Sequence, residues 1–184
     1  MRATVQYTEH SKVFGDDEPQ TGTLTIRRYA PGKLQFMIEF TGRDAYTVAL
    51  RDRTAEVYHP KIDEIQVYDI GKYRDLAQRL MLLGFGMVGR ELSANYEVRD
   101  FRRETVGAEP ATHLELIPKS AEVLAQVRRV ELWIADKTDC PVQQKLYFPD
   151  GDYKLAQFSS LKVNPVLPAS AFDLPKHAKR VRVN

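Results

Sequence analysis

The sequence has little cysteine, little net charge and no long apolar run. Cys140 is the single cysteine among 184 residues, so no disulfide can form within the chain. The 27 basic residues nearly balance the 25 acidic residues, and the formal net charge of +2 is too small to indicate a nucleic-acid partner. The apolar stretch 80–88 is about half as long as a membrane-spanning helix. We therefore expect one globular domain over residues 1–184, without a transmembrane helix.

Motifs for catalysis and metal binding are also missing. The chain has no nucleophile elbow, no phosphate-binding loop and no H-E-x-x-H pair. The glycines of 84–89 match a dinucleotide-binding spacing, but they follow a helical pattern rather than a strand. We interpret Cys140, which lies in a turn, as a residue without a catalytic role. Four histidines are far apart, show no metal-ligand spacing and are expected at the surface or in turns: His10, His59, His113 and His177. We expect no enzyme activity, no metal and no cofactor.

Most of the chain alternates between apolar and polar residues, which is typical of strands. The first strand begins near the N-terminus, with Ala3, Val5 and Tyr7 on one face. The connections are too short for crossover helices, which indicates antiparallel pairing. Further strands are predicted at 22–30, 33–40, 45–52, 54–60, 64–70, 96–106, 111–118, 128–136, 142–149 and 153–163. The chain after residue 163 is rich in proline and then basic.

The pattern changes between residues 72 and 96, where apolar residues recur at helical spacing. Gly84 and Gly86 end or kink this helix, and 89–96 adds a short helical turn. Two interpretations stay open. The helix fills the core of the sheet permanently, as most apolar helix faces do, or it is a hinged lid over a cavity. The glycines, together with Met81 and Met87, favour the lid.

Basic residues gather in two places, 99–104 and 176–182. A solvated strand face and a solvated tail are the simpler interpretation, because Asp100 and Glu104 dilute the first group and the second lies near a chain end. Docking to an acidic partner or to an anionic membrane surface is the alternative.

The order of these motifs resembles a known family. In the first half, "GTLTIRR", "PGKLQFMIEF" and "VALRDRTAEVYHPKIDEIQVYDI" contain a proline-headed strand and a turn at Tyr58-His59-Pro60. In the second half, a proline-led strand, an Asp-Gly turn, an Asn-Pro pair, a phenylalanine and a proline follow in order: Pro141, Asp150, Gly151, Asn164, Pro165, Phe172 and Pro175. Over roughly residues 20–176 this set is similar to the LolA-like outer-membrane lipoprotein carrier and lipoprotein-sorting family.

The resemblance implies an unclosed antiparallel β-barrel with an α-helical lid, at about 72–96, over an apolar cavity. It implies a non-enzymatic periplasmic carrier that binds acyl chains of lipoproteins, or other lipids, and moves them toward the outer membrane. Its partners would be an acylated lipoprotein or lipid, an inner-membrane donor and an outer-membrane acceptor, with only peripheral membrane contact. We expect that a leader has been removed before Met1. The alternative is a sensor or interaction module on the same fold that contacts a protein partner and carries no lipid.

Strand alternation and the helical pattern together predict which side chains line the cavity. The family's arginine after the proline-led turn would fall at Gln35, which forms hydrogen bonds but carries no charge. The predicted ligand-binding residues are Leu34, Phe36, Ile38, Tyr46, Val48, Leu50, Ile65, Val67, Leu80, Leu83, Phe85 and Met87.

Overall fold

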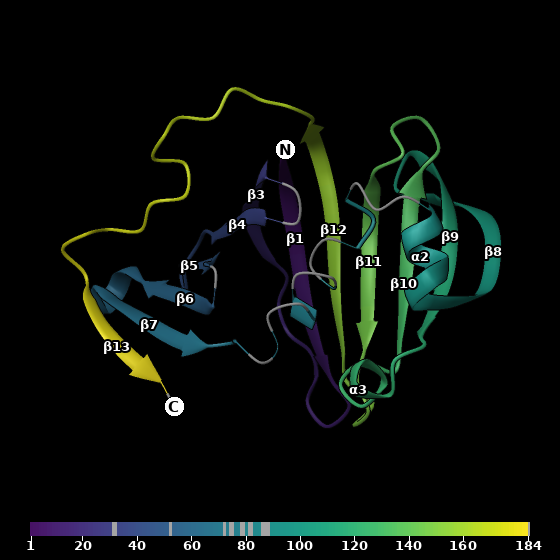
Figure 1. Cartoon of the computed structure of the whole chain (residues 1–184), viewed down its shortest axis with the longest axis horizontal. Helices are drawn as coiled ribbons and strands as arrows, with labels where there is room; N and C mark the ends of the chain where they lie inside the picture. Colours follow the sequence, from purple (N-terminus) through teal and green to yellow (C-terminus); the bar gives the residue numbers. More distant parts are fainter. Residues whose placement is uncertain are drawn as a thin grey trace. The chain divides into compact units, whose positions relative to one another are not determined.

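The computed structural model describes residues 1–30, 33–51, 53–71, 73, 76–77, 80, 83–85 and 89–183. Strands dominate these residues, and helices are short (Figure 1). The helices are η1 (Pro60–Ile62), α2 (Gly89–Asn95) and α3 (Ala121–Leu124). Among the described residues, no helix has both the length and the apolar character needed to cross a membrane.

The described residues form one unclosed sheet of thirteen strands, in the order β13-β7-β6-β5-β4-β3-β1-β12-β11-β10-β9-β8, with β2 beside β1. The mainly β class and the unclosed sheet are therefore as predicted. The strands are β1 (Arg2–Ser11), β2 (Gly15–Asp16), β3 (Gln20–Ala30), β4 (Lys33–Phe40), β5 (Tyr46–Leu50), β6 (Thr54–His59), β7 (Glu64–Asp69), β8 (Tyr96–Val106), β9 (Glu109–Pro118), β10 (Arg129–Ala135), β11 (Pro141–Tyr147), β12 (Tyr153–Lys162) and β13 (Lys179–Val183).

Contacts along the chain define two compact units. Unit 1 contains Met1–Val5, Gln20–Asp75 and Ser159–Asn184, and unit 2 contains Gln6–Pro19 and Leu76–Phe158. Strands β1 and β12 contribute residues to both units. The single domain over residues 1–184 stays a prediction.

Unit 1 covers one face of its sheet with irregular chain from its own C-terminal part. Met37, Ala49 and Ile65 point to this face and pack against Phe172, Leu174 and Ala178. Arg27 lies over the Phe172 ring, 4.9 Å from its centroid, and donates two hydrogen bonds to Gln35 Oε1, at 2.9 and 2.6 Å. Arg51 donates to the Phe172 carbonyl oxygen at 2.5 Å. Gln35 therefore acts as the acceptor that holds an arginine from the neighbouring strand.

The basic tail contains a strand that the sequence analysis did not predict. Residues Lys179–Val183 form β13, which pairs parallel with β7 at the edge of the sheet. Arg180 Nη1 lies 2.9 Å from Oε1 of Glu56, a buried carboxylate on β6. A buried carboxylate needs a cationic partner, and Val181 and Val183 alternate with the basic residues as a strand requires. Sequence reasoning missed this strand because its partner lies more than a hundred residues earlier.

Unit 2 has an apolar face and a polar face on strands β8 to β11. Val130 lies opposite Leu116, and Leu132 is two residues further along the same strand, so all three point to the apolar face. They pack with Leu83, Leu92, Tyr96 and Val127. Helix α2 confirms the short helical turn predicted at 89–96. Of the longer helix predicted before Gly84, residues Leu76, Ala77 and Leu80 are helical. Met81, which the sequence also places in that helix, lies outside the described residues.

The C-terminal cover of unit 1 gives a first prediction. Phe172 is buried in the unit 1 core, whereas Val166 in the same irregular stretch is fully exposed. Phe172→Ala should lower the free energy of unfolding by about 3–5 kcal/mol, the usual cost of removing a buried phenylalanine ring. Val166→Ala, the matched control, should change it by less than about 0.5 kcal/mol. Urea unfolding of both variants measures the difference, and equal losses would contradict the packing described here.

Candidate functional site

The predicted ligand-binding residues on strands β4, β5 and β7 do not all share one face. Strand β4 pairs with β5 so that Phe36 lies opposite Leu50, and Ile38 lies opposite Val48. Residues directly opposite each other point to the same side of a sheet, as do alternate residues of one strand. By register and alternation, six of the predicted residues lie together on one face: Leu34, Phe36, Ile38, Tyr46, Val48 and Leu50.

Ile65 and Val67 lie on the other face, so grouping them with the other six was wrong. Val48 lies opposite Val57, and Val57 lies opposite Gln66. Ile65 and Val67 flank Gln66 and must point the opposite way. There they pack against the Phe172 cluster in the unit 1 core. Both faces of β7 carry semi-buried residues, so alternation in the sequence alone did not reveal which face each apolar residue takes.

The described residues of the predicted lid lie in the core of unit 2. Leu83 is 0% exposed and packs with Leu116 and Leu132, and Leu80 packs against the same cluster. Phe85 is buried, and its ring meets the Phe158 ring edge-on at 4.9 Å. In this structure the described residues of this stretch, Leu80 and Leu83–Phe85, therefore cover an apolar face of the unit 2 sheet, and they alone are meant by the segment 80–85 below. Met87 lies outside the described residues.

Leu80 and Gly84 are attached to the sheet by a side-chain hydrogen bond and by a close backbone approach. Gln144, a buried residue of β11, donates from Nε2 to the Leu80 carbonyl oxygen at 2.8 Å. Gly84 has φ +86°, and a Cβ atom there would lie 3.1 Å from Leu132 Cδ1 and 3.2 Å from Pro141 Cβ. Only glycine fits this conformation and this contact without strain. The segment 80–85, its supporting sheet face and Gln144 form the candidate apolar site.

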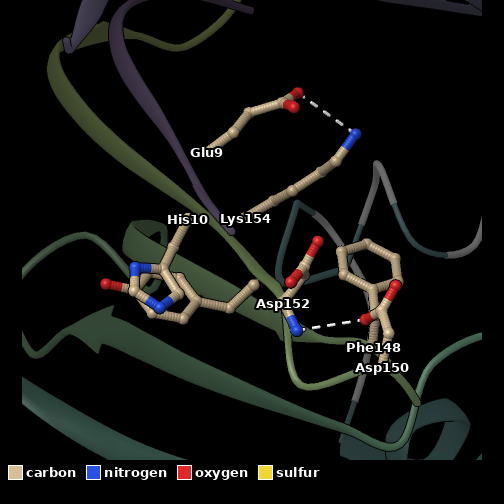
Figure 2. A pocket seen from close by; sticks show the side chains of 7 residues that line it. Glu9, His10, Phe148, Asp150, Asp152 and Lys154 are labelled. Carbon is tan, nitrogen blue, oxygen red and sulfur yellow. Dashed lines mark hydrogen bonds and ion pairs between the residues drawn. The ribbon is translucent and has the colours of Figure 1, made fainter. Parts of the chain in front are cut away.

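A second feature of unit 2 is a polar pocket of about 240 Å³. Figure 2 shows its side chains, which come from the end of β1 and from the turn between β11 and β12. Lys154 Nζ lies 3.2 Å from Glu9 Oε1, and the Asp152 amide donates to Asp150 Oδ1 at 3.0 Å. The lining residues are Glu9, His10, Phe148, Asp150, Asp152, Tyr153 and Lys154.

Electrostatics keep Glu9 ionised at this pocket. Partial burial raises the pKa of Glu9, but the Tyr7 hydroxyl, which donates to Oε1 at 2.6 Å, and the Lys154 ammonium outweigh it. The net result is a lowered pKa. Glu9 therefore carries its negative charge throughout the neutral range.

His10 forms one wall of the pocket. Its ring stacks on Tyr153 at 4.3 Å between centroids, and its Nδ1 lies 2.6 Å from Asp16 Oδ1. The hydrogen bond from His10, followed by one from the Tyr153 hydroxyl at 3.0 Å, lowers the pKa of Asp16. Sequence reasoning treated His10 as a surface or turn residue and missed this arrangement. The Asp-Gly turn was visible, but its proximity to β1 was not.

His113 is not at the surface as predicted. It is 1% exposed on β9, and its ring lies 4.6 Å from that of Trp133 on β10. Trp133 Nε1 donates to Glu104 Oε2 at 2.7 Å, and this bond is the main reason that the pKa of Glu104 is lowered. The prediction rested on the usual exposure of histidine and on the lack of partners nearby in the sequence, but Trp133 on the neighbouring strand covers the ring.

The described residues contain no arrangement that indicates catalysis. Burial raises the pKa of the Cys140 thiol, the opposite of what an activated nucleophile needs. No three His, Cys, Asp or Glu side chains within the described part of the chain are grouped to hold a metal ion. Within the described part of unit 2, the apolar site and the polar pocket are the candidate binding features.

Comparisons with known proteins agree on the fold. No protein-family model and no curated protein matches the chain. Among solved structures, MucB is 15% identical, with a TM-score of 0.57 over 97% of this chain and 58% of MucB. A Pseudomonas aeruginosa MucA/MucB complex matches with 14% identity and a TM-score of 0.52 over 100% of this chain and 59% of that chain. Lipoprotein LppX of Mycobacterium tuberculosis is 12% identical, with a TM-score of 0.51 over 88% of each chain.

The chain has a LolA-like fold. The family resemblance predicted from the motif order is therefore confirmed at this level. At these identities the likenesses show the fold alone. The chain spans 58% and 59% of the two MucB chains, so those proteins contain further sequence that has no counterpart in this match.

The close approach at Gly84 gives a second prediction. Gly84→Ala adds a Cβ that meets Leu132 and also strains a backbone at φ +86°. Gly15 has the same φ of +86° and nothing within 4 Å, so Gly15→Ala imposes the backbone strain alone. Gly84→Ala should lower the free energy of unfolding by about 1–3 kcal/mol more than Gly15→Ala, the usual cost of overpacking a core. Chemical denaturation tests this, and equal losses would show that the segment is not tightly packed.

The Glu9–Lys154 pair gives a third prediction. Lys154→Met should raise the pKa of Glu9, because the nearby positive charge is removed. A lowered folded-state pKa stabilises the fold above the ordinary carboxyl range, and this contribution is lost as pH falls through the lowered value. NMR titration of the Glu9 carboxyl carbon measures the shift. Lys119→Met, which removes an ammonium bonded to the Ser93 carbonyl oxygen, is the control and should leave Glu9 unchanged.

Proposed function

We propose that the protein is a non-enzymatic lipid-binding protein whose apolar site in unit 2 accepts an acyl chain. The observation that carries this proposal is the burial of Leu83 and Phe85, together with the packing of the partly buried Leu80 against the same apolar cluster as Leu83. These side chains and an acyl chain are both hydrocarbon. A bound acyl chain can therefore replace the side chains without needing a polar partner. In this proposal Leu80 and Leu83–Phe85 belong to a lid and occupy the binding site when no lipid is present.

The energetics of exchange support an acyl ligand. Among the described residues, displacing Leu80 and Leu83–Phe85 breaks the side-chain hydrogen bond from Gln144 to Leu80 and exposes the side chains that the ligand replaces. Burying a methylene group stabilises by about 0.8 kcal/mol, and an acyl chain of about 16 carbons carries more hydrocarbon than the side chains of Leu83 and Phe85 together. The left-handed backbone at Gly84 is a natural pivot for this movement.

Location and partners follow from the family resemblance and are part of the proposal. We place the protein in the periplasm, where it would receive the acyl chains of a lipoprotein, or another lipid, from an inner-membrane donor and pass them to an outer-membrane acceptor. The LolA-like fold supports this role. In unit 1, the face that carries Phe36, Ile38, Val48 and Leu50 remains a predicted lipid-contacting surface.

A protein-binding role on the same fold is the second candidate. Two of the matched structures contain MucB together with MucA, at TM-scores of 0.52 and 0.51. A likeness in fold to a protein that binds a partner supports, by analogy, an interaction module that carries no lipid. The acyl-chain proposal has the stronger basis in this chain, because the apolar site is built from its own residues.

A matched pair of glutamines provides the test. Gln144→Met removes the hydrogen bond that holds Leu80 while keeping the side-chain volume, so the lid should be easier to displace. Gln143, its neighbour on the opposite face of β11, accepts a hydrogen bond from Gln157 at 2.9 Å, and Gln143→Met is the control. Gln144→Met should bind a fluorescent palmitoyl probe about three- to tenfold more tightly than the original protein, as expected for one hydrogen bond.

Native mass spectrometry with a palmitoylated lipopeptide should show one bound ligand for the original protein, and Gln143→Met should behave like it. Absence of uptake by both the original protein and Gln144→Met would exclude the acyl-chain carrier. Equal gains for the two variants would show that the lid is not what the ligand displaces.

A further inference from the structure

The hairpin between β1 and β2 exposes two large apolar side chains at its tip. Val13 is 81% exposed and Phe14 is 90% exposed. They lie in the short turn that joins the two strands, immediately before Gly15 with its φ of +86°. Single exposed apolar residues are ordinary on protein surfaces, but two adjacent ones at a hairpin tip form a compact contact point.

Contacts fix the tip to the turn between β11 and β12. The Lys12 amide donates to Asp152 Oδ1 at 2.8 Å, and the Lys12 side chain lies so close to Gly151 that a Cβ there would be 3.0 Å from Lys12 Cδ. Tyr153 donates to Asp16 Oδ1 from the other strand. We call the residues 9–18 and 148–154 the tip surface. All of them belong to unit 2, and they include the polar pocket of Figure 2.

The tip surface is acidic, whereas the whole chain has a net charge of +2. Lys12 and Lys154 are its only two lysines, and it contains no arginine. The ammonium of Lys154 is paired with Glu9. Six carboxylates lie on the tip surface: Glu9, Asp16, Asp17, Glu18, Asp150 and Asp152. The excess of negative charge attracts cations and repels an anionic membrane.

We propose that the tip surface docks a basic segment of a partner polypeptide, in which lysine or arginine side chains alternate with apolar ones. The apolar side chains would pack on Val13 and Phe14. A cationic side chain would bind at Asp150 and Asp152, on the side of the pocket away from Lys154, whose ammonium already pairs with Glu9 and lies 5.8 Å from the centroid of the Phe148 ring. The pocket volume of about 240 Å³ is several times the space of one water molecule, which is enough for the end of a long side chain.

This assignment is independent of the acyl-chain proposal. The apolar site involves Leu80, Leu83 and Phe85, none of which lines the pocket. A protein that fails to bind lipid can still bind a basic peptide, and the reverse also holds. The two proposals therefore succeed or fail on separate measurements.

Strand β8 offers a matched surface for comparison. Phe101 is 71% exposed there, but its neighbours differ in charge: Arg102 pairs with Asp100 at 3.4 Å and with Glu104 at 2.7 Å. The sequence 97–104 contains equal numbers of carboxylates and arginines, and by strand alternation Asp100, Arg102 and Glu104 point to the face opposite Phe101. An exposed apolar side chain without an acidic excess should not favour a basic partner.

The test uses the full chain and three synthetic peptides of about eight residues, in which leucine alternates with arginine, with glutamate or with serine. Fluorescence anisotropy should show binding of the arginine peptide at least about tenfold tighter than that of the other two. This preference should weaken as ionic strength rises from about 0.05 to 0.3 M, because exposed charges are screened.

Two double variants locate the binding. Asp150→Asn with Asp152→Asn removes two charges but keeps the oxygen atoms that accept the turn's hydrogen bonds. Val13→Ser with Phe14→Ser removes the apolar tip. Each pair should weaken binding of the arginine peptide by about fivefold or more, while circular dichroism and the unfolding midpoint stay unchanged. The controls are Phe101→Ser and the exposed pair Glu109→Gln with Glu122→Gln, and both should leave binding unchanged.

Three results would overturn the proposal. The first is equal affinity for the basic, acidic and neutral peptides. The second is an equal loss of binding in the control variants. The third is tip-dependent binding to vesicles of phosphatidylcholine with about one-quarter phosphatidylglycerol, without peptide preference, which would assign the tip to a membrane surface instead.

Discussion

The two faces of an unclosed sheet must both be covered or made polar, and this constraint shapes the rest of the molecule. A strand places alternate side chains on opposite faces, so each apolar stretch requires a cover from elsewhere in the chain. In unit 1, Phe172 and Leu174 provide this cover for Met37 and Ile65. In unit 2, the segment 80–85 provides it together with Leu92 from α2. The polar side of unit 2 needs no cover of this kind, because charged groups such as Glu104 and Arg102 pair with each other across it.

The candidate apolar site follows directly from that constraint. A surface that must be covered by hydrocarbon accepts any hydrocarbon of suitable shape, whether it comes from the chain or from a ligand. Gln144 distinguishes the two situations, because its hydrogen bond to Leu80 is available only to the chain's own segment. The tip surface has a different physical basis, since it depends on charge and on exposed side chains rather than on burial. The two proposals therefore assign two recognition chemistries to different residues of unit 2.

The sequence predicts well what depends on neighbouring residues. Alternation located the strands, and Asp150-Gly151 located the turn between β11 and β12, because both signals are local. The errors all concern contacts between distant segments. Ile65 and Val67 were assigned to the wrong face because the register of β7 depends on β6 and on the Phe172 cluster. His113 was expected at the surface, because the sequence alone does not show that Trp133, a residue of another strand, covers it. The polar pocket was missed for the same reason, because His10 and Tyr153 are far apart in sequence and stack only in the fold.

The division of unit 1 along the chain has a consequence for how the protein is made. Unit 1 takes its residues from before and after unit 2, and the segment that completes its core, with Phe172, Leu174 and β13, follows residue 158. As the polypeptide emerges during synthesis, β3 to β7 must wait with Met37 and Ile65 uncovered until all of unit 2 has been produced. Pairing across such a long stretch of sequence is slow, and exposed strands are prone to aggregate in the interval. Unit 2, whose residues 76–158 are continuous, can form most of its own core before that, so the order of synthesis favours completion of unit 2 first.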